Sequence, residues 1–234
     1  MYILALDTTS SQGGVVLLKD NEVLEANSWQ AFSNHSAALA FNTHQILEKF
    51  KLKVNDLDAI GVCTGPGSYT GIRVVLSFVK GLAALSSIPI VRLSSLDLLA
   101  YQNRDLSPLA VCLDARNAEV YAKFFEKNFQ LTQKDIQESC LSFKDFFVAL
   151  ESKISLSEVF WLGSGAIANA YFLREQGVQE NKILPLEKSQ LDILSLAQLS
   201  FECYQQKLFL GSVLELQGNY LRDFRVRDKG NTSP

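Results

Sequence analysis

Hydrophobic and polar positions follow a regular order in the first half of the 234-residue chain. Short apolar runs separated by turn residues predict three strands, then a helix, a strand and a second helix. Asn34 is placed to cap the first helix, and Ser94 or Ser95 is placed to cap a short third one. The predicted ranges are strands 2–7, 13–19, 22–29, 59–64 and 88–93, and helices 34–50 and 70–86.

The second half repeats this order. Its predicted ranges are strands 109–114, 119–125 and 159–162, a pairing segment at 129–133, and helices 143–150, 166–176 and 191–207. The βββαβα order therefore occurs twice, and each half starts with an apolar strand that ends in aspartate, Asp7 or Asp114. Length alone allows one large domain or two small ones. The repeat favours an α/β fold of two related subdomains, 1–104 and 105–234, with the C-terminal tail packing back on the first.

Composition narrows the function classes. The chain is 47% hydrophobic and 20% charged, and its charge is 22 − 25 = −3. A mildly acidic chain is not expected to bind nucleic acid mainly by neutralising phosphates. No signal peptide and no apolar stretch of membrane-spanning length is visible, so we expect a cytoplasmic protein that does not bind membranes. The four cysteines contain no C-x-x-C pair and fit structural thiols.

Histidine is scarce, and this argues against two kinds of catalysis. His35 and His44 both fall on the first predicted helix, nine residues apart. At about 100° per residue they lie half a turn out of phase and cannot bind one metal ion. The position four residues after His35 is Leu39, so an H-x-x-x-H pair is missing. We therefore expect no metal site and no histidine-based triad.

Glycine-rich turns follow one strand in each half. Gly65-Pro66-Gly67-Ser68-Tyr69-Thr70-Gly71 lacks the lysine of a phosphate-binding P-loop, and Gly163-Ser164-Gly165 has the wrong spacing for a nucleophile elbow. Glycines at such places permit a tight turn or the close approach of a backbone or phosphate, and the sequence leaves both open. Asp7 and Asp114 could hold a magnesium–phosphate pair or could only start turns.

Two predicted helices have a face that the core does not need. On the first, Ala37, Phe41 and His44 lie opposite the apolar stripe. On the second, a narrow strip combines small and cationic residues, namely Arg73, Ser77, Lys80, Gly81 and Ala84. Small residues at helical spacing allow another helix to approach closely, within the molecule or from a partner. The pair of spare faces favours a partner.

Four segments then resemble a known family. They are Ile3-Leu4-Ala5-Leu6-Asp7-Thr8-Thr9, the 65–73 stretch ending in Gly71-Ile72-Arg73, Leu113-Asp114-Ala115-Arg116 with Glu119-Val120-Tyr121, and Tyr220-Leu221-Arg222. In this order they resemble the TsaB (YeaZ) branch of the Gcp/Kae1-like family. The resemblance implies the duplicated acetate and sugar kinase/Hsp70/actin (RNase H-like) fold. Gly218 stands where members of this branch often carry proline.

The resemblance also implies a function. TsaB-like chains act as a non-catalytic scaffold in forming N6-threonylcarbamoyladenosine (t6A) on the tRNA adenosine next to the anticodon. They bind the catalytic paralogue TsaD, together with the ATPase TsaE, and form homodimers when alone. TsaD-like chains carry the H-x-x-x-H metal pair that is missing at His35 and Leu39. The two spare helix faces correspond to the pairing surface, and tRNA is expected to be contacted only indirectly.

Two alternatives remain. The first is a magnesium-dependent nucleotide-binding phosphotransferase or ATPase of the same superfold, acting through Asp7 and Asp114. The second is a Gcp-like peptidase, which the histidine geometry disfavours. We expect no resident cofactor. ATP or ADP binding is expected to be weak at most, with Asp7, Thr8, Gly163 and Gly165 as the candidate residues.

Overall fold

The first half of the chain forms a five-stranded sheet in the order β3-β2-β1-β4-β5. Strands β1 (Tyr2–Asp7), β2 (Gln12–Lys19) and β3 (Glu22–Gln30) form an antiparallel meander. Strands β4 (Ala59–Cys63) and β5 (Ile90–Leu93) continue the sheet in parallel with β1. This computed structural model describes residues 1–30, 34–127, 129 and 138–221.

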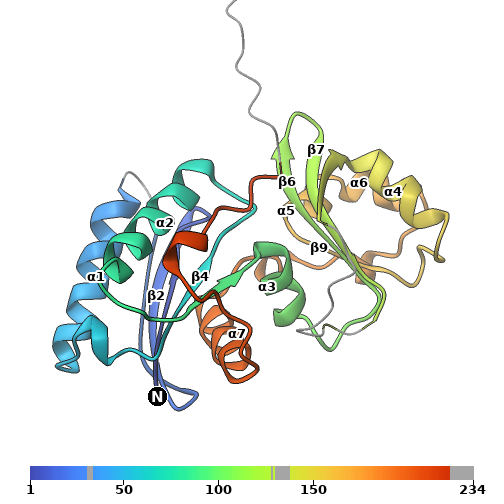
Figure 1. Cartoon of the computed structure of the whole chain (residues 1–234). Coiled ribbons are helices and arrows are strands. Elements are labelled where there is room, and N and C mark those ends of the chain that lie inside the picture. The colour runs from blue at the N-terminus through green and yellow to red at the C-terminus, as the bar shows by residue number, and fades with distance from the viewer. Residues whose placement is uncertain (31–33, 128, 130–137, 222–234) are drawn as a thin grey trace, which may run out of the picture.

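Helices cover both faces of this sheet, as Figure 1 shows. On one face lie α1 (His35–Lys49) and α2 (Tyr69–Ala83), and on the other lies α7 (Ile193–Gln205). The helix α3 (Ser95–Gln102) follows β5 and contacts the second half of the molecule. Side-chain oxygens accept hydrogen bonds from the first-turn amides, and the capping residues are Asn34, Ser68 and Ser94. Asn34 and Ser94 are caps that the sequence predicts.

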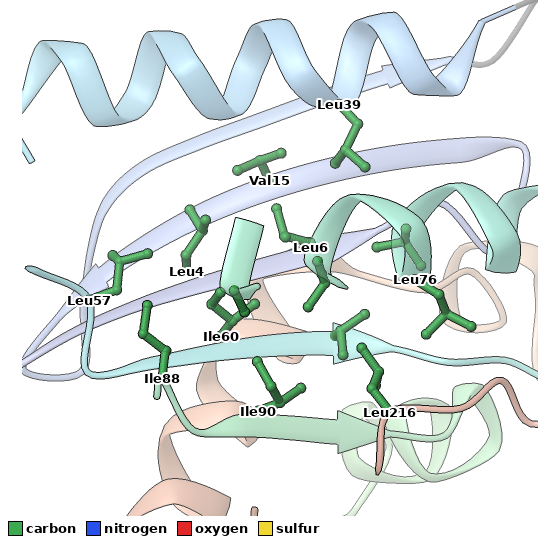
Figure 2. Close-up of a cluster of buried hydrophobic side chains, with 14 of the residues drawn as sticks. Leu4, Leu6, Val15, Leu39, Leu57, Ile60, Leu76, Ile88, Ile90 and Leu216 are labelled. Atoms are coloured by element: carbon green, nitrogen blue, oxygen red, sulfur yellow. The ribbon is translucent and has the colours of Figure 1, made fainter. Parts of the chain in front are cut away.

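Alternation along the strands divides the apolar residues between two cores. Leu4, Leu6 and Val15 point toward α1 and α2, where they pack with Leu39 and Ile60 (Figure 2). The intervening residues of the same strands point the other way, toward α7. This second set includes Ile3, Ala5, Val16 and Leu18, packed with Leu196 and Leu199. The sheet is therefore buried on both faces.

The second half repeats the topology with a smaller sheet, in the order β8-β7-β6-β9. Its strands are β6 (Leu109–Arg116), β7 (Glu119–Phe125), β8 (Ser139–Ser142) and β9 (Phe160–Leu162). Its helices are α4 (Phe143–Glu151), α5 (Ser164–Ala168) and α6 (Ala170–Glu175). The twice-occurring βββαβα order is confirmed. Within the described ranges, a counterpart of β5 is missing from the second sheet.

Two predicted elements differ from the structure. The predicted helix at 166–176 is two helices, because Asn169 ends α5 and its Nδ2 donates to Gly165 O at 2.8 Å. The strand that pairs with β7 is β8, whereas residues 130–133 of the predicted segment lie outside the described residues. Short 3-10 helices were not predicted. They are η1 (Val54–Asp56), η2 (Glu180–Lys182), η3 (Leu186–Lys188) and η4 (Val213–Glu215).

The chain returns to the first sheet after α7. We call residues 210–221 the C-terminal strap. Leu210 forms a bridge with Ile90 on β5, η4 contacts α2, and Leu216 is fully buried in the core under α2. The amide of Asn219 donates to Thr64 O at 2.9 Å. In Figure 1 the strap runs beside α2 toward β6. The boundary at 104/105 stays a prediction.

A search of the described helices for one long and apolar enough to cross a bilayer finds none.

Candidate functional site

Helices α1 and α2 lie side by side and present an exposed surface, which we call the α1–α2 face. On α1, the core stripe is buried at Leu39, Thr43, Ile46 and Leu47. Residues on the opposite side are exposed, namely Ala37, Phe41 and His44. Phe41 is 59% exposed, which is unusual for a phenylalanine and marks the apolar centre of this helix surface.

The predicted strip on α2 is also exposed, and it consists of Arg73, Ser77, Lys80, Gly81 and Ala84. A Cβ atom built on Gly81 would meet nothing within 4 Å. The strip therefore does not serve packing inside the described part of the molecule, and the fold does not require a glycine at position 81. Exposure is what the helical spacing predicts. Partner binding by these eight residues stays a prediction.

The first glycine-rich turn packs against the chain itself. A Cβ atom on Gly67 would lie 2.4 Å from Thr9 O, and one on Gly71 would lie 1.8 Å from Thr8 O. The hydroxyl of Thr8 donates to Gly71 O at 2.7 Å, and the amide of Ser68 donates to Thr9 O at 2.7 Å. These glycines thus allow two backbone segments to touch. Of the two roles that the sequence leaves open, these contacts favour a packed turn over a phosphate-binding loop.

Asp7 lies at the end of β1 inside a buried polar cluster. Its Oδ1 accepts hydrogen bonds from the amide and the hydroxyl of Thr9, at 2.8 and 2.7 Å. The Cys63 thiol lies 3.5 Å from Thr9 Oγ1 and 3.2 Å from Ser95 Oγ. Burial raises the pKa of Asp7, although the Thr9 hydrogen bonds oppose this, and burial raises the pKa of Cys63 to about 12. Burial disfavours the charged carboxylate and thiolate that a metal ligand or a nucleophile would need. The two groups are therefore better suited to holding the turn together through hydrogen bonds.

The second glycine-rich turn has the same character. Gly163 has a φ of 101°, and a Cβ atom there would lie 2.2 Å from Cys112 O. Its amide donates to Ser189 Oγ, and a Cβ atom on Gly165 would lie 2.8 Å from Val120 Cγ1. Asp114 is exposed and accepts from the Arg116 amide within its own turn. The strand-end carboxylates and glycines are therefore occupied by local contacts, and weak nucleotide binding at Asp7, Thr8, Gly163 and Gly165 stays a prediction.

His35 is held by hydrogen bonds on both ring nitrogens. The Trp29 indole N–H donates to Nδ1 at 3.3 Å, and Nε2 lies 3.0 Å from Ser10 O. An accepting Nδ1 places the proton on Nε2, which then donates to the carbonyl. His44 is exposed on the other side of α1, with Nε2 3.6 Å from Glu48. Among the described side chains, no group of three or more His, Cys, Asp or Glu could hold a metal ion.

Sequence reasoning missed one part of the surface, at the N-terminal end of α2. The rings of Tyr69 and Tyr220 lie 5.5 Å apart, and the Arg73 guanidinium lies 5.5 Å from the Tyr69 ring centre. Tyr69 and Tyr220 are 43% and 50% exposed, and Leu214 in η4 is 85% exposed. The C-terminal strap thereby extends the α1–α2 face. Only its apolar residues could have indicated this, because a strap has no helical or strand period.

Comparison with known proteins then identifies the family. The family model for TsaD, tRNA N6-adenosine threonylcarbamoyltransferase, matches residues 29–171. The Bacillus subtilis tRNA threonylcarbamoyladenosine biosynthesis protein TsaB is 32% identical over 154 residues, which cover 65% of this chain and 67% of that protein. This chain belongs to the TsaB family. The Haemophilus influenzae TsaB is 27% identical over 239 residues, covering 95% of this chain and 94% of that protein.

Two solved structures share the fold of this chain. A Pseudomonas aeruginosa protein described as similar to peptidase YeaZ has a TM-score of 0.72 and 25% identity, covering 94% of this chain and 99% of that one. A second structure, YeaZ from the same organism, has a TM-score of 0.66 and 23% identity over 92% and 98% of the two chains. The resemblance to the TsaB family is confirmed, and the duplicated βββαβα topology of the two sheets agrees with the fold that it implies. The chain is a member of a family of tRNA threonylcarbamoyladenosine biosynthesis proteins.

Proposed function

We propose that this chain is a non-catalytic scaffold subunit for t6A formation. It pairs through the α1–α2 face with a TsaD-type catalytic paralogue, and a TsaE-type ATPase completes the assembly. When the paralogue is absent, a second copy of the chain occupies the same face. The catalytic partner contacts the tRNA, which suits a subunit of net charge −3.

One observation carries this proposal. Two adjacent helices present Phe41, 59% exposed, beside the open strip around Gly81. An exposed aromatic next to small residues is suited to close packing with helices of another chain. The chain that carries this surface also belongs to a family whose named members are t6A biosynthesis proteins.

The absence of catalysis is supported by the arrangement of the polar groups. His35 uses both ring nitrogens in hydrogen bonds, and Leu39 occupies the position of the second histidine in the core. The strand-end groups that a phosphotransferase would use are engaged in local packing. These contacts favour a structural role over both alternative activities.

The substitution Gly81→Arg tests the proposal. The new side chain has room in the isolated subunit, because a Cβ atom meets nothing within 4 Å, but it would lie in the centre of the paired surface. We expect an unchanged melting temperature, a loss of pairing of at least about 100-fold, and loss of t6A synthesis in a reconstituted assay. Affinity is measured by titration of the purified TsaD-type paralogue.

Ala149→Arg is the matched control, since Ala149 is an exposed residue of α4. It introduces the same side chain on a helix outside the α1–α2 face, and it should leave pairing intact. Wild-type affinity of a folded Gly81→Arg variant would refute the α1–α2 face as the pairing surface. Full t6A synthesis without the chain would refute the scaffold role.

A further inference from the structure

The α1–α2 face has an uneven charge distribution. No Asp or Glu lies between Glu25 and Glu48, or between Asp58 and Asp97, although the chain has more acidic than basic residues overall. These two gaps contain nearly all of α1 and the whole of α2. The face is therefore a cationic surface on an acidic protein.

The α1–α2 face carries two exposed cations, Arg73 and Lys80. Arg73 and Lys80 lie about two turns apart on the same side of α2, and neither forms an ion pair with a carboxylate in the part of the chain that the structure describes. Four other lysines or arginines in the same part do form such pairs, including Lys49 with Glu25 at 2.6 Å and Arg174 with Glu180 at 2.5 Å. Water solvates an unpaired cation on an exposed surface, so it does not lower stability there. When a partner chain buries the cation, it needs a carboxylate to neutralise it.

The acids at the margin of the face do not supply that carboxylate. Glu48 lies at the C-terminal end of α1, 3.6 Å from His44. Glu215 lies in η4 and points toward Gly211, where an added Cβ atom would be 3.9 Å from its Oε1. Arg73 is instead stacked on Tyr69, which in turn contacts Tyr220 of the C-terminal strap. The guanidinium is thus oriented by aromatic rings, with its hydrogen-bond donors left available.

We propose that the α1–α2 face selects a partner whose helices carry carboxylates opposite Arg73 and Lys80, in preference to a second copy of this chain. The inference rests on the proposed function, because it specifies what the pairing surface recognises. A symmetric pair places the same patch on both sides. Two copies would bring four cations together across two surfaces that carry few carboxylates, whereas a carboxylate-bearing paralogue neutralises them.

Salt dependence separates the two kinds of pairing. Screening by salt weakens attraction between opposite charges and relieves repulsion between like charges. On raising NaCl from about 50 to about 500 mM, we expect pairing with the purified TsaD-type paralogue to weaken by roughly tenfold. Self-association of the full chain should strengthen or stay constant over the same range, as followed by sedimentation.

Charge reversal gives the decisive measurement. In about 50 mM NaCl, the double variant Arg73→Glu/Lys80→Glu should bind the paralogue at least about 30-fold more weakly than wild type, and the difference should shrink at high salt. An equimolar mixture of this variant with wild type should associate more tightly than either protein alone, because the two faces are then complementary. Lys144→Glu/Lys153→Glu changes the net charge equally at exposed sites of the second half and should alter neither binding reaction.

Each failure has a distinct meaning. If the double variant binds the paralogue like wild type while Gly81→Arg abolishes binding, the charge selection is refuted and the pairing surface stands. If self-association of the wild type tightens as salt is lowered, the selection is also refuted. If Gly81→Arg and the double variant both bind like wild type, the pairing surface itself is refuted.

Discussion

Gly71 and Gly81 lie in the same helix, α2, and serve opposite purposes. At Gly71 a Cβ atom would lie 1.8 Å from Thr8 O, whereas at Gly81 it would meet nothing within 4 Å. The first glycine lets the start of α2 touch the turn after β1. The second is not required by the fold.

Alanine substitution at these two positions should have opposite effects on stability. Gly71→Ala should lower the free energy of unfolding by about 3 kcal/mol or more, because backbone must move to admit the methyl group. Gly81→Ala should raise it by roughly 0.5–1 kcal/mol, because alanine is the better helix former at an open position. Urea denaturation of both variants measures the two changes. Equal effects would show that α2 does not depend on contact with Thr8.

At this scale, helical spacing predicts which side chains are exposed but not what the glycines contact. The outward positions of Phe41 and Gly81 follow from about 100° per residue along each helix. The contact between Thr8 and Gly71 joins residues 63 positions apart, so no local pattern contains it. The sequence therefore leaves the purpose of the glycine-rich turn open, and the packed backbone explains it.

Among the elements, the C-terminal strap contributes more to the first sheet than its irregular sequence suggests. Leu216 is fully buried among residues of β1, β4 and α2, while Leu214, two positions earlier, is 85% exposed. Leu216→Ala should therefore lower the free energy of unfolding by about 3 kcal/mol, through lost burial and the cavity left behind. Denaturant titration provides the measurement.

Leu214→Ala is the matched control for this substitution. It removes the same atoms from the same short segment, and it should change stability by no more than about 0.5 kcal/mol. Equal losses at positions 214 and 216 would contradict the placement of the strap.

Strong hydrophobic periods in the sequence predict the strands and α1, α2 and α7 within a few residues. The strap and the break at Asn169 were missed because tertiary contacts, rather than a repeating pattern, determine them.

At the scale of the whole molecule, a partly buried ion cluster joins the two halves. Lys123 on β7 lies 2.6 Å from Asp97 on α3 and 3.7 Å from Glu138, just before β8. Asn219 of the strap donates a hydrogen bond to Glu138. Burial raises the pKa of Asp97, and the ammonium group of Lys123 opposes that rise. Residues from α3, from the second sheet and from the C-terminal strap therefore meet around one lysine.

Lys123→Met should destabilise the protein by about 3 kcal/mol at pH 7, because two carboxylates lose their counter-ion. Loss of the lysine raises the pKa of Asp97 further. A carboxyl whose pKa is raised by folding contributes less stability as pH rises above its ordinary pKa, so the variant should lose stability more steeply than wild type as pH rises from about 4 to 7. Thermal unfolding across this range tests the slope. The exposed Lys144→Met variant should follow wild type.

The duplicated topology could be predicted from the order of strands and helices, because each half repeats the same local patterns. The way in which the halves are joined could not. Lys123, Asp97 and Glu138 are isolated charges in the sequence, and only the folded chain brings them together. The same holds for Tyr69 and Tyr220, whose ring contact depends on the return of the strap.

The return of α7 to the first sheet has a consequence for how the chain is made. Synthesis on the ribosome delivers β1 and β2 before the second half and α7 after it, so Ile3, Ala5, Val16 and Leu18 have no cover while the second half is made. The second half has its own core around Trp161 and can fold before α7 covers this face of the first sheet. Transiently exposed apolar surface is what chaperones bind. The first sheet to emerge is therefore the last to be completed, and the nascent chain presents a chaperone-binding surface until α7 arrives.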